Sequence, residues 1–283
     1  MLIRHVALVS EESKISMGEL SAVAAALQKQ ATRDLAPLWR LEATVTAFER
    51  LEDLPLDYWP VVVKDDIGDP RAAGYHEDEN GQPFALVQYS AGWTLTASHE
   101  VCEMLVDPFG RRLVSGQSPV PGQGRVRFLV EVCDPSEADE YAYKINGIKM
   151  SDFYTPHYFD PKRSSGVRYS FTDAITEPKQ VLRGGYLSWY VAESRQWWQR
   201  SWFGAKPADE PLEGFKSGGN LRESLDRYRE NDRARAMHRG LEEKASGTAA
   251  LMGRRGGAIS DILQSPARAQ MLRQTIAEVS RRK

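Results

Sequence analysis

The 283-residue sequence contains only two cysteines, Cys102 and Cys133, and it lacks a long apolar run. Two thiols in a chain of this length are typical of a reducing compartment rather than of a disulfide-rich secreted domain. A membrane-spanning helix needs roughly 20 consecutive apolar residues, and no segment approaches that length. The N-terminus reaches Glu11 and Glu12 without the apolar region or cleavage site of a secretory signal. We therefore expect no membrane contact, and either a cytoplasmic location or leaderless export in a phage-like particle.

A strong net charge is also lacking, since the whole chain carries −2. The charge is unevenly distributed: residues 216–283 contain 15 basic and 8 acidic residues, a net +7, which leaves −9 for residues 1–215. Acidic residues are interleaved through this basic segment and Tyr228 is its only aromatic residue, a composition that argues against nucleic acid as a partner. We expect a linker at residues 205–219. Residues 220–283 should form a charged helical or partly disordered tail that docks on a protein partner.

All seven tryptophans lie at or before Trp202, so we expect one folded domain over residues 1–204. The pattern predicts an α+β fold with a mixed sheet, followed beyond Ser151 by an irregular aromatic-rich subdomain. Residues 65–83 are predicted to form a loop, and Asn146-Gly147 a hairpin turn. Strands are predicted at residues 5–10, 41–48, 59–64, 84–89 and 127–133.

Two helices are predicted in this domain. Apolar residues recur at helical spacing from Ser16 to Leu35, where Ser16 and Glu19 are placed as a capping box. We expect Pro37 to end this helix. The second helix spans residues 93–106 and is expected to end at Asp107-Pro108.

The second predicted helix carries the residues that point to chemistry. His99 and Glu103 are four residues apart, so both side chains project from one face, and Glu100 lies beside them. Zinc peptidases use two ligands one helical turn apart, together with a carboxylate that takes a proton from the metal-bound water. Their usual motif is H-E-x-x-H. Here Glu103 takes the second ligand position, which adds negative charge to the metal and should raise the pKa of its water.

The surrounding residues resemble a set of bacterial and phage metallopeptidase-like proteins. The shared pattern is S-H-E-x-x-E-x-x-x-D-P, here Ser98 to Pro108, followed by the acidic segment from Glu131 to Asp134, and the resemblance covers roughly residues 20–200. The order of elements also resembles that of the zincins, in which a strand–helix–strand unit and an edge strand precede the active-site helix. This resemblance implies a zincin-like domain that binds zinc.

A zinc site needs a third protein ligand. The resemblance to the glutamate-type zincins implies Glu131, and Asp107, Asp134 and His157 are the alternatives. A thiolate from Cys133, expected on the same strand face as Glu131, is a further candidate. The oxyanion could be stabilised by a histidine or tyrosine, and Met150 could underlie the site as a Met-turn. The candidates for the oxyanion role are His157, Tyr154 and Tyr158.

Each of these residues also has a purely structural interpretation. Asp107-Pro108 can simply end a helix, Glu131 and Asp134 can flank a strand end, and Cys102 can be a small core residue. The three other histidines, His5, His76 and His238, are assigned no function. Five acidic residues of the predicted loop lack the spacing of a calcium-binding loop and are expected to be solvated. These are Asp65, Asp66, Asp69, Asp78 and Glu79.

We therefore expect a zinc-dependent hydrolase, specifically a metallopeptidase that acts on a peptide or protein. His99, Glu103 and Glu131 would hold the zinc, Glu100 would act as general base and proton donor, and His157 would be a second catalytic residue. The alternative is a catalytically inactive zincin-like component of a phage particle or other large assembly, which docks through its C-terminal tail.

Overall fold

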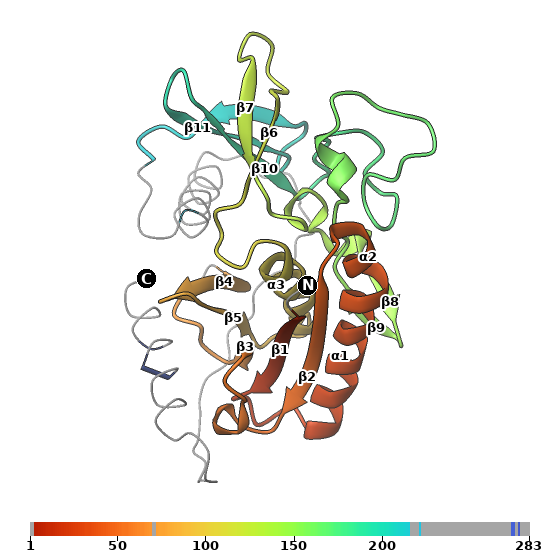
Figure 1. Cartoon of the computed structure of the whole chain (residues 1–283), viewed down its shortest axis with the longest axis vertical. Helices are drawn as coiled ribbons and strands as arrows, with labels where there is room; N and C mark the ends of the chain where they lie inside the picture. The colour runs from red at the N-terminus through yellow and green to blue at the C-terminus, as the bar shows by residue number, and fades with distance from the viewer. Residues whose placement is uncertain (1–2, 70–71, 216–220, 222–272, 275–276, 278–283) are drawn as a thin grey trace. The chain divides into compact units, whose positions relative to one another are not determined.

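The structure is a computed structural model that describes residues 3–69, 72–215, 221, 273–274 and 277, and the chain divides into two compact units (Figure 1). The described residues of the first unit are 3–69, 72–105, 144–150, 273–274 and 277. The second unit contains residues 106–143 and 151–215, with Leu221. Within the described part of the chain, no helix is long and apolar enough to cross a membrane.

The first unit is built on a five-stranded mixed sheet with the strand order β2-β1-β3-β5-β4. Four strands run parallel, and the edge strand β4 is antiparallel to its neighbour β5. The chain is thus a mixed α/β protein, in agreement with the coarse prediction. The strands are β1 (Ile3–Ser10), β2 (Glu42–Phe48), β3 (Tyr58–Lys64), β4 (Gly74–Glu79) and β5 (Gln82–Gln88).

The first helical segment begins as predicted and continues further than predicted. Ser16 Oγ accepts a hydrogen bond from the main-chain nitrogen of Glu19 at 3.1 Å, which caps the N-terminus. The prediction that Pro37 ends the helix is wrong. Pro37 lies in the first turn of α2, where a missing N–H is tolerated, and the chain leaves the helix at Arg40 in the left-handed conformation. The segments are α1 (Met17–Lys29), the π-helical turn η1 (Gln30–Leu35) and α2 (Ala36–Trp39).

Strand β4 lies inside the segment 65–83 that was predicted to be a loop, so the prediction is wrong for residues 74–79. A short hairpin turn joins β4 to β5, and its residues Asn80 and Gly81 have φ angles of 54° and 79°. Asn-Gly is the preferred sequence for such a turn. In the resulting register His76 pairs with Ala85, so these two side chains lie on the same face of the sheet.

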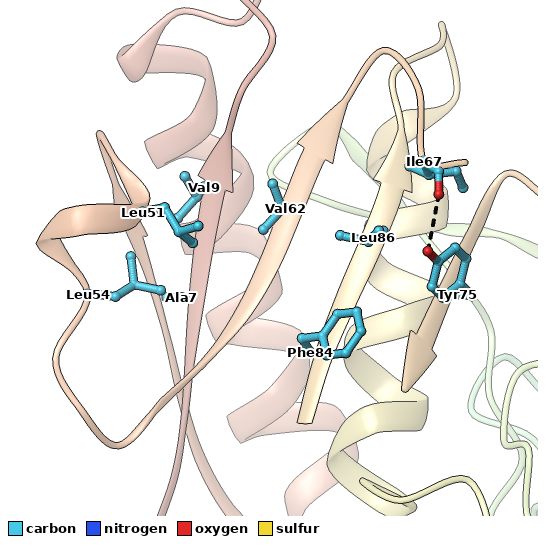
Figure 2. Packing of buried hydrophobic residues seen from close by; sticks show 9 residues of the cluster. All are labelled: Ala7, Val9, Leu51, Leu54, Val62, Ile67, Tyr75, Phe84 and Leu86. Atoms are coloured by element: carbon cyan, nitrogen blue, oxygen red, sulfur yellow. Dashed lines mark hydrogen bonds between the residues drawn. The ribbon is translucent and has the colours of Figure 1, made fainter. Parts of the chain in front are cut away.

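An apolar cluster fills one face of the sheet in the first unit, as Figure 2 shows with the helices behind the strands. Tyr75 belongs to this cluster, and its hydroxyl donates a hydrogen bond to the carbonyl oxygen of Ile67 at 3.1 Å. Because side chains alternate along a strand, Gly74 and His76 face the other side of the sheet. The cluster consists of Ala7, Val9, Leu51, Leu54, Val62, Ile67, Tyr75, Phe84 and Leu86.

The second unit contains an antiparallel five-stranded sheet with the order β12-β11-β10-β7-β6. The aromatic segment predicted to be irregular supplies β10 and β11, where Trp189 is fully buried and stacks with Trp198. Strand β12 lies within the predicted linker. The strands are β6 (Leu113–Gln117), β7 (Arg125–Leu129), β10 (Tyr186–Val191), β11 (Gln196–Ser201) and β12 (Ala208–Pro211).

Short elements complete the described chain. The predicted turn at Asn146-Gly147 is confirmed, because both residues have positive φ angles and join the two strands of a separate hairpin. These elements are η2 (Leu51–Asp53), η3 (Asp134–Ser136), η4 (Asp139–Tyr141), β8 (Tyr143–Ile145), β9 (Ile148–Met150) and η5 (Pro156–Phe159).

The predicted tail, residues 220–283, lies almost entirely outside the described residues. The described exceptions include Arg273, whose guanidinium forms ion pairs with Glu52 and with Glu11, the latter at 3.9 Å, both in the first unit. The prediction that the tail docks on another protein stays a prediction.

Candidate metal centre

Helix α3 (Trp93–Val106) has the two ends predicted from the sequence. Asp107 follows it, and a carboxylate oxygen of Asp107 accepts a hydrogen bond from the main-chain nitrogen of Arg112. The Arg112 guanidinium in turn donates to the carbonyl oxygen of Val106 at 3.0 Å, which satisfies one of the carbonyl groups left free at a helix C-terminus. The structural role predicted for Asp107, ending the helix, is therefore confirmed.

Two close contacts fix α3 within the first unit. Opposite Gly74, the helix approaches so closely that a methyl group at residue 74 would lie 2.6 Å from Thr96 Cγ2 and 3.2 Å from Glu100 Cγ. α3 therefore covers the face of β4 that carries Gly74 and His76. On its other flank, Ser98 Oγ donates a buried hydrogen bond of 2.8 Å to Gln30 Oε1 in the π-helical turn. The residue that precedes His99 is thus anchored to a neighbouring helix.

Four ionisable side chains, three from α3 and one from β4, form contacts that share Glu103. His99 Nε2 lies 3.3 Å from Glu103 Oε1. From the facing strand, His76 Nδ1 lies 3.5 Å from Glu100 Oε2 and 3.9 Å from Glu103 Oε2. His76, Glu100 and Glu103 are 1%, 3% and 0% exposed, whereas His99 is partly exposed. The two oxygens of Glu103 therefore each face a different imidazole.

These separations suit a metal ion. Zinc binds imidazole nitrogen and carboxylate oxygen at about 2.0–2.2 Å, so two donors at the tetrahedral angle lie roughly 3.4 Å apart. The His99–Glu103 distance of 3.3 Å and the His76–Glu100 distance of 3.5 Å are close to that value. Two buried carboxylates one turn apart also repel each other, and a divalent cation between them would offset both charges.

No protein-family model, curated protein or solved structure matches this chain. The interpretation of the cluster therefore rests on its donor atoms, their separations and their burial. All three properties fit a borderline divalent cation such as zinc, which accepts mixed nitrogen and oxygen ligands. The three residues His76, Glu100 and Glu103 place one donor atom each within 4.8 Å of one another, inside a single unit of the structure.

The predicted third ligand and its nearest alternatives belong to the second unit. Glu131, Cys133 and Asp134 are all buried there. Strand β7 ends at Leu129, so the prediction of a strand through Cys133 is wrong at its C-terminal end. The expected common strand face of Glu131 and Cys133 is consequently wrong as well, and Asp134 begins the short helix η3. The assignment of Glu131 as third ligand stays a prediction.

The residues predicted for the oxyanion role also lie in the second unit. His157 is exposed in η5, and its Nδ1 lies 3.0 Å from Asp160 Oδ2. Tyr158 is completely buried, which raises the pKa of its phenol well above the ordinary value, and its hydroxyl donates to the carbonyl oxygen of Gln180 at 3.0 Å. Tyr154 stacks against Tyr158 with ring centroids 4.3 Å apart. A catalytic role for His157 or for either tyrosine stays a prediction.

The sulfur-containing residues of the prediction are buried. Cys102 is a free, fully buried thiol within α3, as expected for a small core residue. Met150 is fully buried at the end of β9, in the first unit. Its role as a Met-turn beneath the metal stays a prediction.

His76 is the site residue that sequence reasoning missed. From the sequence it is assigned no function, and the acidic segment around it is predicted to form a loop. The signal that could have found it is Asn80-Gly81, which stands two residues before a predicted strand and favours a two-stranded hairpin. A hairpin partner ending at Glu79 would contain His76 and place it on one face of the sheet.

Proposed function

We propose that this chain is a zinc-dependent hydrolase of the zincin type, a metallopeptidase that acts on peptides or proteins. The observation that carries the proposal is the 3.3 Å separation of His99 Nε2 and Glu103 Oε1, with Glu100 on the same turn of α3. The order of elements supports it, because a strand–helix–strand unit (β1, α1, β2) and an antiparallel edge strand, β4, precede α3.

His99 and Glu103 would hold the zinc, and we keep Glu131 as the proposed third ligand. The residues fit this metal, since an imidazole nitrogen and carboxylate oxygens are among its ordinary ligands. When bound, zinc supplies a water of lowered pKa and a positive charge that polarises the substrate carbonyl. Glu103 is 0% exposed, and a cation beside its carboxylate would offset the free-energy cost of burying that negative charge.

Glu100 would act as the general base. Its carboxylate is 3% exposed and is held against β4, where bulk water does not compete for it. It would accept a proton from the attacking water and pass that proton to the leaving nitrogen of the peptide bond. His99 is partly exposed, so the cluster is not sealed from solvent on the side of this residue.

The proposal is tested by zinc content and by hydrolysis. His99→Gln and Glu103→Gln should each weaken zinc binding by more than about 100-fold, since even residues behind a metal ligand contribute about 10–100-fold. Glu100→Gln should keep the zinc equivalent that His99→Gln loses, while hydrolysis of a fluorogenic peptide library falls by at least about 100-fold. Zinc that remains bound in both ligand variants would contradict the proposal.

The alternative, an inactive component of a phage particle or other assembly, remains a prediction. It depends on the C-terminal tail, in which the described Arg273 forms ion pairs with Glu52 and Glu11 of the first unit. The metal analysis also bears on this alternative. A chain that binds stoichiometric zinc at His99 and hydrolyses no peptide would favour it over the hydrolase.

A further inference from the structure

His76 is a fully buried imidazole that faces two buried carboxylates, and the proposed hydrolase uses those carboxylates without using His76. Its Nδ1 lies 3.5 Å from Glu100 Oε2 and 3.9 Å from Glu103 Oε2. Hydrogen bonds between a charged donor and a carboxylate are about 2.7–2.9 Å long. Both separations exceed that range by more than half an ångström, so neither pair is an ordinary charge-assisted hydrogen bond.

The same separations agree with donors arranged around one cation. Donors at about 2.1 Å from a metal lie roughly 3.4 Å apart at the tetrahedral angle and roughly 4.2 Å apart when they are opposite each other. The two distances from His76 fall between these limits. The three donor atoms of His76, Glu100 and Glu103 all lie within 4.8 Å of one another.

Glu103 connects this group to the His99 position. Its Oε1 faces His99 Nε2 at 3.3 Å, and its Oε2 faces His76 Nδ1 at 3.9 Å. A carboxylate that presents its two oxygens to two different imidazoles has the arrangement of a bridging ligand. In two-metal hydrolases the ions are about 3.5–4 Å apart, a spacing that one carboxylate can span.

We infer that His76, Glu103 and the Oε2 atom of Glu100 form a second position for a divalent metal ion, and that Glu103 is shared between this position and the one at His99. Glu100 Oε1 is left for the general-base role. The inference rests on the proposed function because both positions use Glu103. It adds a ligand from β4 to residues that otherwise come from α3. It also explains why an imidazole stands on the buried face of an edge strand directly opposite two carboxylates.

The test is a zinc titration of the metal-free full-length chain, followed by isothermal calorimetry and by metal analysis after gel filtration. His76→Gln preserves the approximate volume of the side chain and removes the ligand nitrogen. We expect this variant to bind one zinc equivalent fewer than the wild type, or to bind it more than about 100-fold more weakly. Glu103→Gln should weaken both equivalents.

His5→Gln is the matched control. His5 lies in β1 of the same sheet, where its Nδ1 is 2.7 Å from Thr44 Oγ1 and its ring stacks on Tyr58. The substitution is chemically identical, but it removes an imidazole outside the metal cluster, so zinc binding should equal that of the wild type. Circular dichroism of each metal-free variant verifies that it is folded.

The outcomes separate the inference from the proposed function. If His76→Gln binds as many zinc ions as the wild type and with the same affinity, the second position does not exist, whereas His99→Gln still tests the first. Loss of one equivalent in His76→Gln and of a different one in His99→Gln supports both. Should His76→Gln fail to fold, Glu100→Gln tests the second position instead. It removes a ligand of that position together with a buried charge, so it must lose the zinc ion of the second position.

Discussion

Replacing Gly74 by alanine should force β4 and α3 apart beside His76 and Glu100. The added methyl group would lie 2.6 Å from Thr96 Cγ2 and 3.1 Å from the carbonyl oxygen of Leu86. Carbon atoms pack favourably at about 3.5–4.0 Å, so the neighbours must move by about 1 Å. Overpacking of this kind costs about 1–3 kcal/mol. Alanine recovers roughly 0.5–1 kcal/mol through the lower entropy of the unfolded chain, and we expect a net loss of about 1 kcal/mol.

Urea unfolding measures this loss, with Gly18→Ala as the control. Gly18 lies in α1, where a methyl group would meet nothing closer than Ser16 Oγ at 3.8 Å, so alanine should be neutral or stabilising by up to about 1 kcal/mol. Glu100 Cγ lies 3.2 Å from the methyl group of Gly74→Ala. Zinc binding at the inferred second position should therefore weaken in Gly74→Ala and not in Gly18→Ala. A Gly74→Ala chain with the unfolding midpoint and zinc affinity of the wild type would refute the packing argument.

Two further predictions concern single buried polar groups. Ser98→Ala removes the hydrogen bond to Gln30 and should cost about 1 kcal/mol in urea unfolding; a double-mutant cycle with Gln30→Leu that gives no coupling would contradict this. Burial raises the pKa of the Asp152 carboxyl above its ordinary 3.8, so the folded chain binds the proton more tightly than the unfolded chain and stability falls as pH rises from 3.8 through the folded pKa. Asp152→Asn keeps an acceptor for the 2.9 Å hydrogen bond from the Thr172 nitrogen and should gain stability over the wild type across this pH range. A difference in the free energy of unfolding between the two chains that does not change with pH would be evidence against a raised pKa of Asp152.

The elements that were predicted well are those with a strong local pattern. α3 was placed at both ends because apolar residues recur at helical spacing and Asp107-Pro108 follows them. β3 was recognised from a continuous apolar run, which buried parallel strands show. β4 was missed because Gly74–Glu79 is mostly polar, as edge strands often are, and its pairing with β5 is not encoded in its own composition.

Local sequence patterns also predict only part of the candidate site. Helix geometry alone places His99 and Glu103 on one face, and their 3.3 Å separation agrees with that expectation. The position of His76 depends on a hairpin register and on the close approach that Gly74 permits, which are tertiary features. The end of β7 at Leu129 was misjudged because the apolar residues Val130 and Val132 continue the strand pattern beyond the last paired residue.

The division into two units was also beyond the reach of local patterns. The hairpin residues 144–150 belong to the first unit, although the chain on both sides of them belongs to the second. A sequence scan follows the chain continuously and therefore groups these residues with their neighbours. Contacts between residues far apart in the sequence decide which unit the hairpin belongs to.

Anomalous scattering at the zinc absorption edge, from crystals of the full chain grown with zinc, tests whether His99 and Glu103 bind one zinc ion together. We expect an anomalous peak within about 2.0–2.2 Å of both His99 Nε2 and Glu103 Oε1. Crystals that contain zinc elsewhere, and in which His99 and Glu103 face each other with no peak between them, would contradict it.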